Sequence, residues 1–202
     1  MRITGCLLVL LCAGTTGFAQ SEVQWSREIQ WSPERRLTKD DFKGRVPLNA
    51  PSASMSWIHI ETEWECKDET FVATARATFD PSLSWWRNSR GSVWGNQGER
   101  ISSTQALQDA RRSVMELDMQ LLDHEQLHFD IAEVTARKIR ARFADLKHAC
   151  VEAGGTDPIA QMVAQADREL QEEQQRYDRE TGHGVNARAQ DQWKRRIRAL
   201  LN

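Results

Sequence analysis

Apolar and polar residues alternate in two neighbouring stretches, residues 57–66 and 71–79, and this period of two is typical of half-buried β-strands. The residues predicted to face one side in the first stretch are Ile58, Ile60, Thr62, Trp64 and Cys66. Residues 67–70 suit a hairpin turn between the two stretches. A shorter alternation over residues 23–31 predicts another strand. The N-terminal half is therefore predicted to form a small antiparallel sheet.

A long helix is predicted next, because no Gly or Pro occurs between Ile101 and Cys150 and apolar residues recur there at helical spacing. This helix is expected to end near Lys147. Residues 104–118 form either its beginning or a separate helix. Before the sheet strands, residues 36–44 predict a short helical turn capped by Thr38.

Two further helices are predicted near the C-terminus. Asp157 and Pro158 supply an N-cap and a first helical residue. The apolar stripe that follows is Ile159, Met162, Val163, Ala166, Leu170 and Tyr177. After a glycine-containing interruption, Asn186 is expected to cap the last helix. Its predicted buried residues are Ala189, Trp193, Ile197 and Leu200.

These elements predict an α+β fold, with strands at about 23–80 followed by helices at about 104–202. The 202 residues suit one domain with its own core, over residues 20–202. Residues 1–19 resemble a secretory signal peptide, with Arg2, an apolar run and a small-x-small site ending at Ala19. Cleavage after Ala19 would export the protein to a periplasm or to the outside, and the apolar run is too short to span a bilayer comfortably. A lipoprotein is the weaker alternative, because Leu11 precedes Cys12.

Export affects the interpretation of the cysteines. Cleavage would leave Cys66 and Cys150, and two cysteines in an oxidising compartment most simply form one disulfide. The alternative is two buried free thiols. The net charge of -2 gives no electrostatic reason to expect nucleic acid or an anionic membrane as a partner.

The strongest chemical signal is the pattern His-Glu-x-x-His, formed by His124, Glu125 and His128. On a helix the two histidines lie about 40° apart on one face, and Glu125 lies about 100° from His124. Two imidazoles so placed can bind zinc while the glutamate works on a water molecule. An accidental match on an ordinary amphipathic helix is the alternative.

A catalytic zinc usually needs a third protein ligand. On the same helix Glu133 and Asp130 point away from the two histidines, and His148 lies about 30 Å further along. His183 is the preferred candidate, because Gly182 and Gly184 let the backbone approach a metal closely. His59 on the first hairpin strand stays an open alternative.

Three stretches of this chain resemble the bacterial domain of unknown function 922 family, whose members are described as secreted zinc-dependent proteases. They are residues 31–44, from Trp31 to Gly44, residues 124–133 around the histidine motif, and residues 177–184, Tyr-Asp-Arg-Glu-Thr-Gly-His-Gly. The resemblance implies a mixed fold with N-terminal strands and C-terminal helices. It also supports His183 as a metal ligand.

The sequence thus leads to the hypothesis of a zinc-dependent hydrolase that cleaves a peptide or protein substrate. His124, His128 and His183 would hold Zn²⁺, and Glu125 would act as general base. Tyr177 is a candidate donor to the oxyanion or a core residue. Asp123 and Asp178 are candidates for orienting the imidazoles, or helix-surface residues. The alternative function is a non-catalytic exported protein that binds a metal, a partner or a glycan.

Overall fold

A computed structural model of the chain describes residues 28–50, 52–67, 70–87, 104–146 and 157–202. The predicted signal peptide and Cys150 lie outside the described residues. The proposed Cys66–Cys150 disulfide therefore stays a prediction. Within the described ranges, no helix is both long and apolar enough to cross a membrane.

The predicted hairpin is present as β3 (Ile58–Lys67) and β4 (Thr70–Phe79). The two strands pair antiparallel from Ile58 opposite Phe79 to Lys67 opposite Thr70. β1 (Ile29–Gln30) pairs with the other edge of β4, so the strand order is β1-β4-β3. β1 is the described part of the strand predicted at 23–31. This sheet confirms the predicted N-terminal sheet.

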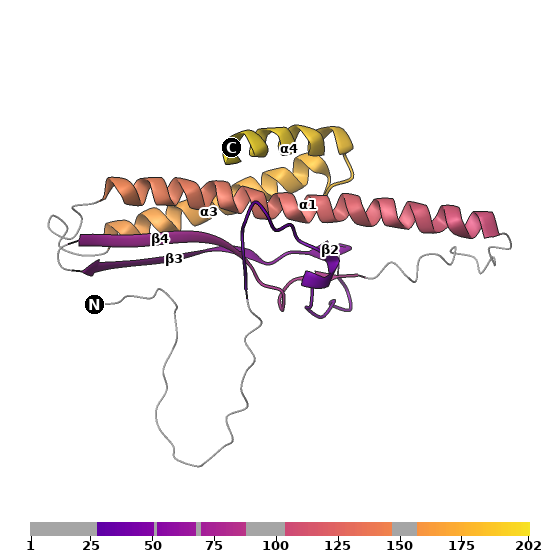
Figure 1. Cartoon of the computed structure of the whole chain (residues 1–202), viewed down its shortest axis with the longest axis horizontal. Helices are drawn as coiled ribbons and strands as arrows, with labels where there is room; N and C mark the ends of the chain where they lie inside the picture. Colours follow the sequence, from indigo (N-terminus) through magenta and orange to yellow (C-terminus); the bar gives the residue numbers. More distant parts are fainter. Residues whose placement is uncertain (1–27, 51, 68–69, 88–103, 147–156) are drawn as a thin grey trace, which may run out of the picture.

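One helix, α1 (Thr104–Asp145), carries the histidine motif. Its 42 residues show that residues 104–118 are the beginning of the motif helix. The middle and C-terminal parts of α1 lie along the β3–β4 hairpin, while its N-terminal part extends beyond the hairpin (Figure 1). Phe129 of α1 packs against Phe79 of β4 in the core, with ring centroids 6.2 Å apart.

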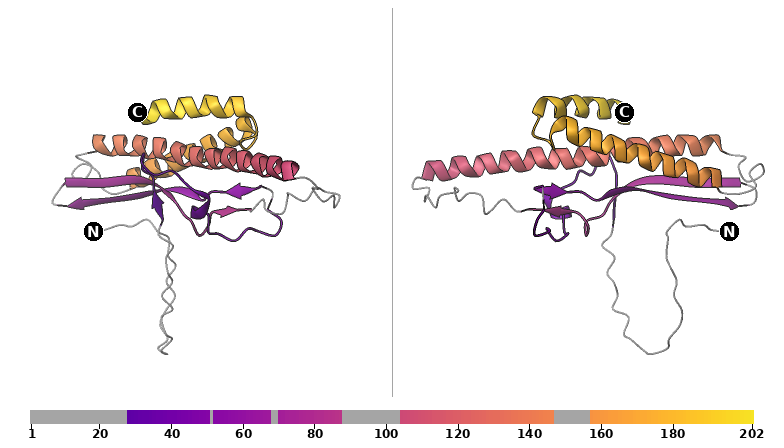
Figure 2. Two further views of the ribbon diagram at one scale, coloured as in Figure 1. Left: turned by 45° about the vertical axis from the view of Figure 1, so that its right-hand side comes forward. Right: turned by 180° about the vertical axis from the view of Figure 1, so that it is seen from behind.

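The two predicted C-terminal helices are α3 (Asp157–Thr181) and α4 (Ala187–Leu201). The Asn186 side chain caps α4 by accepting a hydrogen bond from the Ala189 backbone amide at 3.2 Å. α4 lies on the side of α1 opposite the sheet (Figures 1 and 2). Trp193 and Ile197 are buried as predicted.

One core assignment in α4 is wrong. Leu200 is 50% exposed, whereas Leu201 packs against the core. Leu201 continues the line that runs through Trp193 and Ile197 in steps of four residues, and such residues share one face of a helix. Leu200 lies at the edge of that face.

A second, two-stranded sheet was not predicted. β2 (Ser54–Met55) pairs antiparallel with β5 (Trp85–Trp86). The predicted helical turn is present as the 3₁₀ helix η1 (Lys39–Asp41), and the backbone amide of Thr38 donates to the Asp41 carboxylate at 2.7 Å. Both segments join the core through Phe42, whose ring centroid lies 5.3 Å from that of Trp86. The second sheet places β2 against the motif helix.

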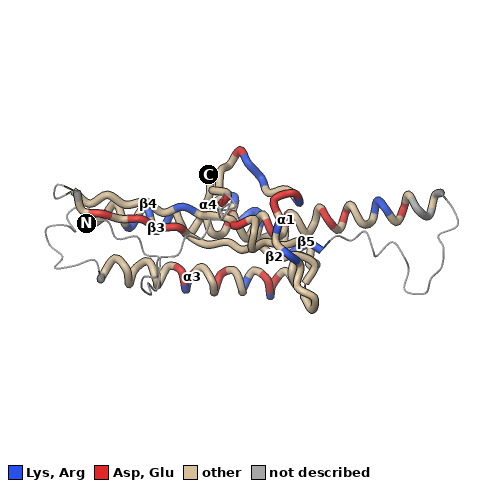
Figure 3. The backbone as a smooth tube through the Cα atoms, turned by 90° about the horizontal axis from the view of Figure 1, so that it is seen from below, with Lys and Arg blue, Asp and Glu red and all other residues tan. Residues whose placement is uncertain are grey.

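Basic and acidic residue positions are mixed along α1 and α3 (Figure 3). Glu133 of α1 is buried and pairs with Arg140 at 2.7 Å and with Arg137 at 3.1 Å. Glu133 points away from the histidines of the motif, as the helical spacing predicted. It belongs to the structure of α1 and not to the candidate site.

Candidate metal centre

The two histidines of the motif meet on one face of α1. The Nε2 atoms of His124 and His128 lie 3.1 Å apart, as their four-residue spacing predicts. His124 is buried and only 13% of the His128 side chain is exposed. The lone pairs of both nitrogens can therefore reach the same point.

Asp178, in the last turn of α3, completes a close group of three atoms. Its Oδ1 lies 3.1 Å from His124 Nε2 and 3.0 Å from His128 Nε2. The sequence analysis had offered Asp178 as a residue that orients an imidazole by a hydrogen bond to the nitrogen that does not bind the metal. In the structure it contacts the Nε2 atoms, on the side where a metal would be held.

His183 joins this group from the turn between α3 and α4. Its Nδ1 lies 3.4 Å from Asp178 Oδ1. Ligand atoms of His124, Asp178 and His183 all lie within 4.8 Å of one another, a separation that a metal ion can bridge. The other candidate, His59, lies on β3, where its Nε2 is 2.9 Å from Thr78 Oγ1. The structure thus brings His183 to the group, as the sequence predicted, and adds Asp178.

Two glutamines fix the orientation of the imidazoles. The side-chain amide of Gln174 donates to the backbone carbonyl of His128 at 2.9 Å, so its carbonyl oxygen faces His128 Nδ1, with which it forms a hydrogen bond. The carbonyl oxygen of Gln190 lies 3.4 Å from His124 Nδ1. In a neutral imidazole, an oxygen that accepts from Nδ1–H leaves Nε2 unprotonated and free to bind a metal.

The sequence analysis did not predict either glutamine. Gln174 lies one helical turn before Asp178 on α3, and this four-residue spacing could have indicated a shared face. Gln190 lies 66 residues from His124 and has no comparable signal in the sequence.

Electrostatics in the group favour a positive charge. Burial alone would raise the pKa of Asp178, but the contacts with His124 and His128 hold it well below its usual range. Burial would lower the pKa of His128, but Asp178 and Glu125 raise it above its ordinary value. Asp178 is therefore ionised at neutral pH, and the site stabilises a cation beside it.

Glu125 of the motif is buried against β2. Its carboxylate accepts hydrogen bonds from Ser54 Oγ at 2.6 Å and from Ser56 Oγ at 2.5 Å. A carboxylate offers about four lone-pair positions, so each oxygen can still accept another hydrogen bond. The second sheet thus fixes the orientation of this carboxylate.

Tyr177 lies directly behind the two histidines. Its ring stacks on His124 at a centroid distance of 4.6 Å and meets the His128 ring edge-on at 4.8 Å. The side chain is fully buried, and its hydroxyl donates to Gln190 at 2.7 Å. Burial raises the pKa of Tyr177 far above its ordinary value, so the hydroxyl stays protonated. This geometry makes Tyr177 a packing platform for the imidazoles.

Asp123, the other candidate for orienting an imidazole, instead joins two other segments of the chain to α1. Its carboxylate pairs with Arg36 at 2.8 Å and with Lys194 at 2.8 Å. The structure thus attaches the start of the motif to both the N-terminal segment and α4.

Glycine is needed at position 184 for two reasons. Gly184 has φ +85°, and a Cβ there would lie 3.0 Å from the Cβ of His124. Gly182 has φ +57°, but an added Cβ would meet nothing within 4 Å. A substitution at Gly182 would therefore add backbone strain alone, whereas a substitution at Gly184 would add strain and also contact the His124 side chain.

Gly184→Ala is therefore expected to destabilise the protein by about 1–3 kcal/mol and to weaken metal binding, because it adds strain and displaces His124. Gly182→Ala should cost about 1 kcal/mol through strain alone and leave metal binding nearly unchanged. Thermal unfolding and zinc titration of both variants would measure this difference. Equal metal affinities would contradict the proposed contact with His124.

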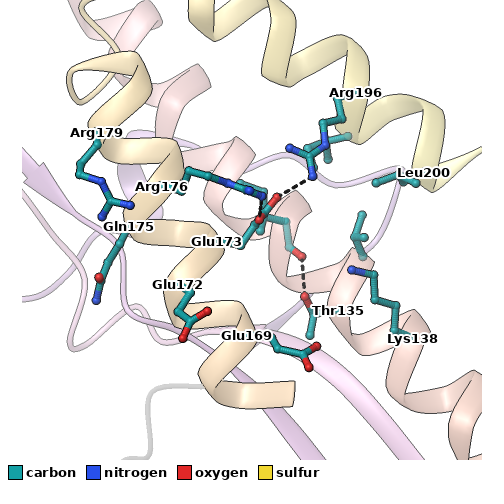
Figure 4. Close-up of a pocket in the computed structure, with 13 residues that line it drawn as sticks. Thr135, Lys138, Glu169, Glu172, Glu173, Gln175, Arg176, Arg179, Arg196 and Leu200 are labelled. Carbon is teal, nitrogen blue, oxygen red and sulfur yellow. Dashed lines mark hydrogen bonds and ion pairs between the residues drawn. The ribbon is translucent and has the colours of Figure 1, made fainter. Parts of the chain in front are cut away.

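A hollow of about 540 Å³ lies between α1, α3 and α4, away from the histidines (Figure 4). Its lining includes Ile131 and Ile197, and also Glu173, which pairs with Arg176 and Arg196. None of the residues that line the hollow belongs to the metal group. We assign the site from the converging donor atoms and not from this hollow.

The fold and the converging donors define an α+β protein with a candidate metal centre built on a His-Glu-x-x-His helix. Residues 99–184 match the family described as "Bacterial protein of unknown function (DUF922)". This match confirms the resemblance to that family over residues 99–184. No curated protein and no solved structure matches the chain. Ser54, Ser56 and Gln190 contribute to the site from outside the matched residues.

Proposed function

We propose that the protein is a metal-dependent hydrolase whose substrate is a peptide or a protein. One observation supports this most strongly: the Nε2 atoms of His124 and His128 and Oδ1 of Asp178 lie 3.0–3.1 Å apart. With both Nδ1 atoms facing glutamine oxygens, all three atoms present lone pairs to one another. A metal ion, or a proton on one of the imidazoles, would satisfy such a group.

The three residues fit a zinc ion. Two ligand atoms at about 2.0–2.1 Å from a tetrahedral zinc lie about 3.3 Å apart, close to the separations in this group. Imidazole nitrogens and a carboxylate oxygen are ligands that zinc accepts. His124, His128 and Asp178 would therefore hold Zn²⁺, and His183 lies close enough to join them.

A bound zinc ion would polarise a carbonyl group and lower the pKa of a water molecule. Glu125 would take the proton of that water and pass it to the leaving amine. Ser54 and Ser56 would hold the Glu125 carboxylate in place for this transfer. Tyr177 would keep the two imidazoles in position.

The proposed substrate and location come from the sequence. The family resemblance suggests peptide bond hydrolysis, and the signal-like residues 1–19 suggest export to a periplasm or to the medium. The substrate is therefore expected among proteins or peptides outside the cytoplasm.

A second candidate function is metal binding without catalysis. The burial of Glu125, and the hydrogen bonds that both its oxygens receive, favour this alternative. In that case Glu125 would join α1 to β2, and the metal would stabilise the junction of α1 and α3. Both functions need the metal, but only the first needs Glu125 as a base.

Metal removal should lower the stability of the protein. A ligand at 100 times its dissociation constant stabilises the folded state by about 2.7 kcal/mol, which for this length means about 5 °C or more in Tm. We expect that shift when zinc-loaded protein is treated with a chelator and followed by calorimetry. His124→Ala should show no shift on chelation. An unchanged Tm in the natural sequence, together with no zinc in the purified protein, would reject the metal site.

A further inference from the structure

We propose that His183 is a displaceable fourth ligand, which closes the metal site and opens it when another ligand binds. This inference rests on the metal site proposed above and concerns how access to it is controlled.

The position of His183 differs from that of the other three donors. Its Nδ1 is 3.4 Å from Asp178 Oδ1, whereas each Nε2 of the motif lies 3.0–3.1 Å from the same oxygen. Its ring centroid lies 6.5 Å from that of His124. His183 is therefore at the edge of the group, within reach of a metal held by the other three.

The His183 side chain is also held much less firmly than the others. His124 stacks on Tyr177, and Gln174 bonds His128 at both its ring and its carbonyl oxygen. By contrast 74% of the His183 side chain is exposed, and the only polar contact of its ring with the described residues is with Asp178. This imidazole can leave the group without breaking any other hydrogen bond of its ring described in the structure.

The backbone around His183 forms a tight turn that is held in place, so any movement falls to the side chain. Gly182, His183 and Gly184 all have positive φ, of 57°, 54° and 85°. Gly184 packs against the His124 side chain, whereas a Cβ at Gly182 would meet nothing within 4 Å. The His183 amide donates to the Asp178 carbonyl at 3.0 Å, and the Val185 amide donates to the Gly182 carbonyl at 3.3 Å. The exposed His183 ring would therefore leave the group by rotation about its own side-chain bonds.

The number of protein ligands decides what a zinc site can do. Four protein ligands close the site, as in structural zinc sites, whereas three leave a position for water or substrate. With His183 bound the centre would be closed, and with His183 released it would be open. Any incoming ligand would then have to compete with His183. Its apparent affinity would be lower in proportion to the fraction of the protein in which the site is open.

The experiment uses the purified chain loaded with Co²⁺ as a spectroscopic probe and acetohydroxamate as the competing ligand. We compare the natural sequence with His183→Gly, because glycine tolerates the positive φ and removes the ligand. His183→Gly should still bind one Co²⁺ per chain, with a changed visible spectrum. It should bind acetohydroxamate at least tenfold more tightly, which corresponds to a closed fraction of about 90%. His59→Ala is the matched control and should behave like the natural sequence.

Two results would overturn the proposal while leaving the metal site intact. Identical spectra and identical acetohydroxamate affinities would show that His183 is not a ligand. Suppose that His183→Gly binds no Co²⁺ while its circular dichroism spectrum shows that it is folded like the natural sequence. His183 would then be an indispensable ligand and not a displaceable one. If the natural sequence itself binds no Co²⁺, the proposed function fails together with this inference.

Discussion

Replacing Asp178 by alanine is expected to give folded protein that purifies with almost no zinc. The substitution removes the oxygen that lies 3.0–3.1 Å from both Nε2 atoms and the negative charge that favours a cation there. Removing a residue that only orients a ligand typically costs 10- to 100-fold in metal affinity, and loss of one ligand should cost more. Metal analysis by mass spectrometry after dialysis against a weak chelator would measure the loss.

The matched control for this variant is Asp167→Ala. Asp167 is an exposed aspartate on the same helix, so its removal tests the effect of one lost charge on α3. It should retain zinc at the level of the natural sequence. Full zinc occupancy in Asp178→Ala would instead assign the third ligand to His183, as the sequence alone suggested.

Glu125→Gln should leave the zinc content near that of the natural sequence and reduce hydrolysis by at least 100-fold. Glutamine has the shape of glutamate and can still accept from Ser54 or Ser56, but it cannot take a proton from water. A peptide library digested by zinc-loaded protein and read by mass spectrometry would provide the activity. Glu116→Gln, an exposed position on the same helix, is the matched control and should stay active.

The outcome for Glu125 separates the two candidate functions. Activity of Glu125→Gln within tenfold of the natural sequence would exclude Glu125 as the base. If zinc-loaded natural protein cleaves no peptide in the library, while Glu125→Gln is markedly less stable, the non-catalytic function is favoured. Glu125 would then serve to hold β2 against α1.

The periodic elements could be predicted from the sequence because their burial repeats. The alternation from Phe71 to Phe79 and the stripe that ends at Tyr177 each report which face is buried, over many residues. The pair of strands β2 and β5 could not be found in this way. Two residues per strand are too few to show a period, and the strands pair across 30 residues of chain, from Met55 to Trp85.

The residues of the candidate site also differ in whether a local sequence pattern could predict them. His124 and His128 could be paired from their spacing, because one helix carries both. Asp178 is 50 residues from His128, and its distance from the Nε2 atoms depends on how α3 crosses α1. The sequence analysis offered it only as a candidate for orienting an imidazole or as a helix-surface residue, and not as a metal ligand. Helix crossing is set by side-chain packing, which no local pattern reports.

The donor set of two imidazoles and one carboxylate also bears on which metal would occupy the site in practice. Ligands of this kind bind divalent ions in an order that rises to copper, with nickel close behind and zinc also strong. A group of this composition discriminates weakly among the three, so the supply of metal would decide occupancy. Protein purified on a nickel resin would then carry nickel at His124, His128 and Asp178, and its metal content would reflect the column. Selectivity for one metal would then depend on which metals are available in the compartment where the chain folds.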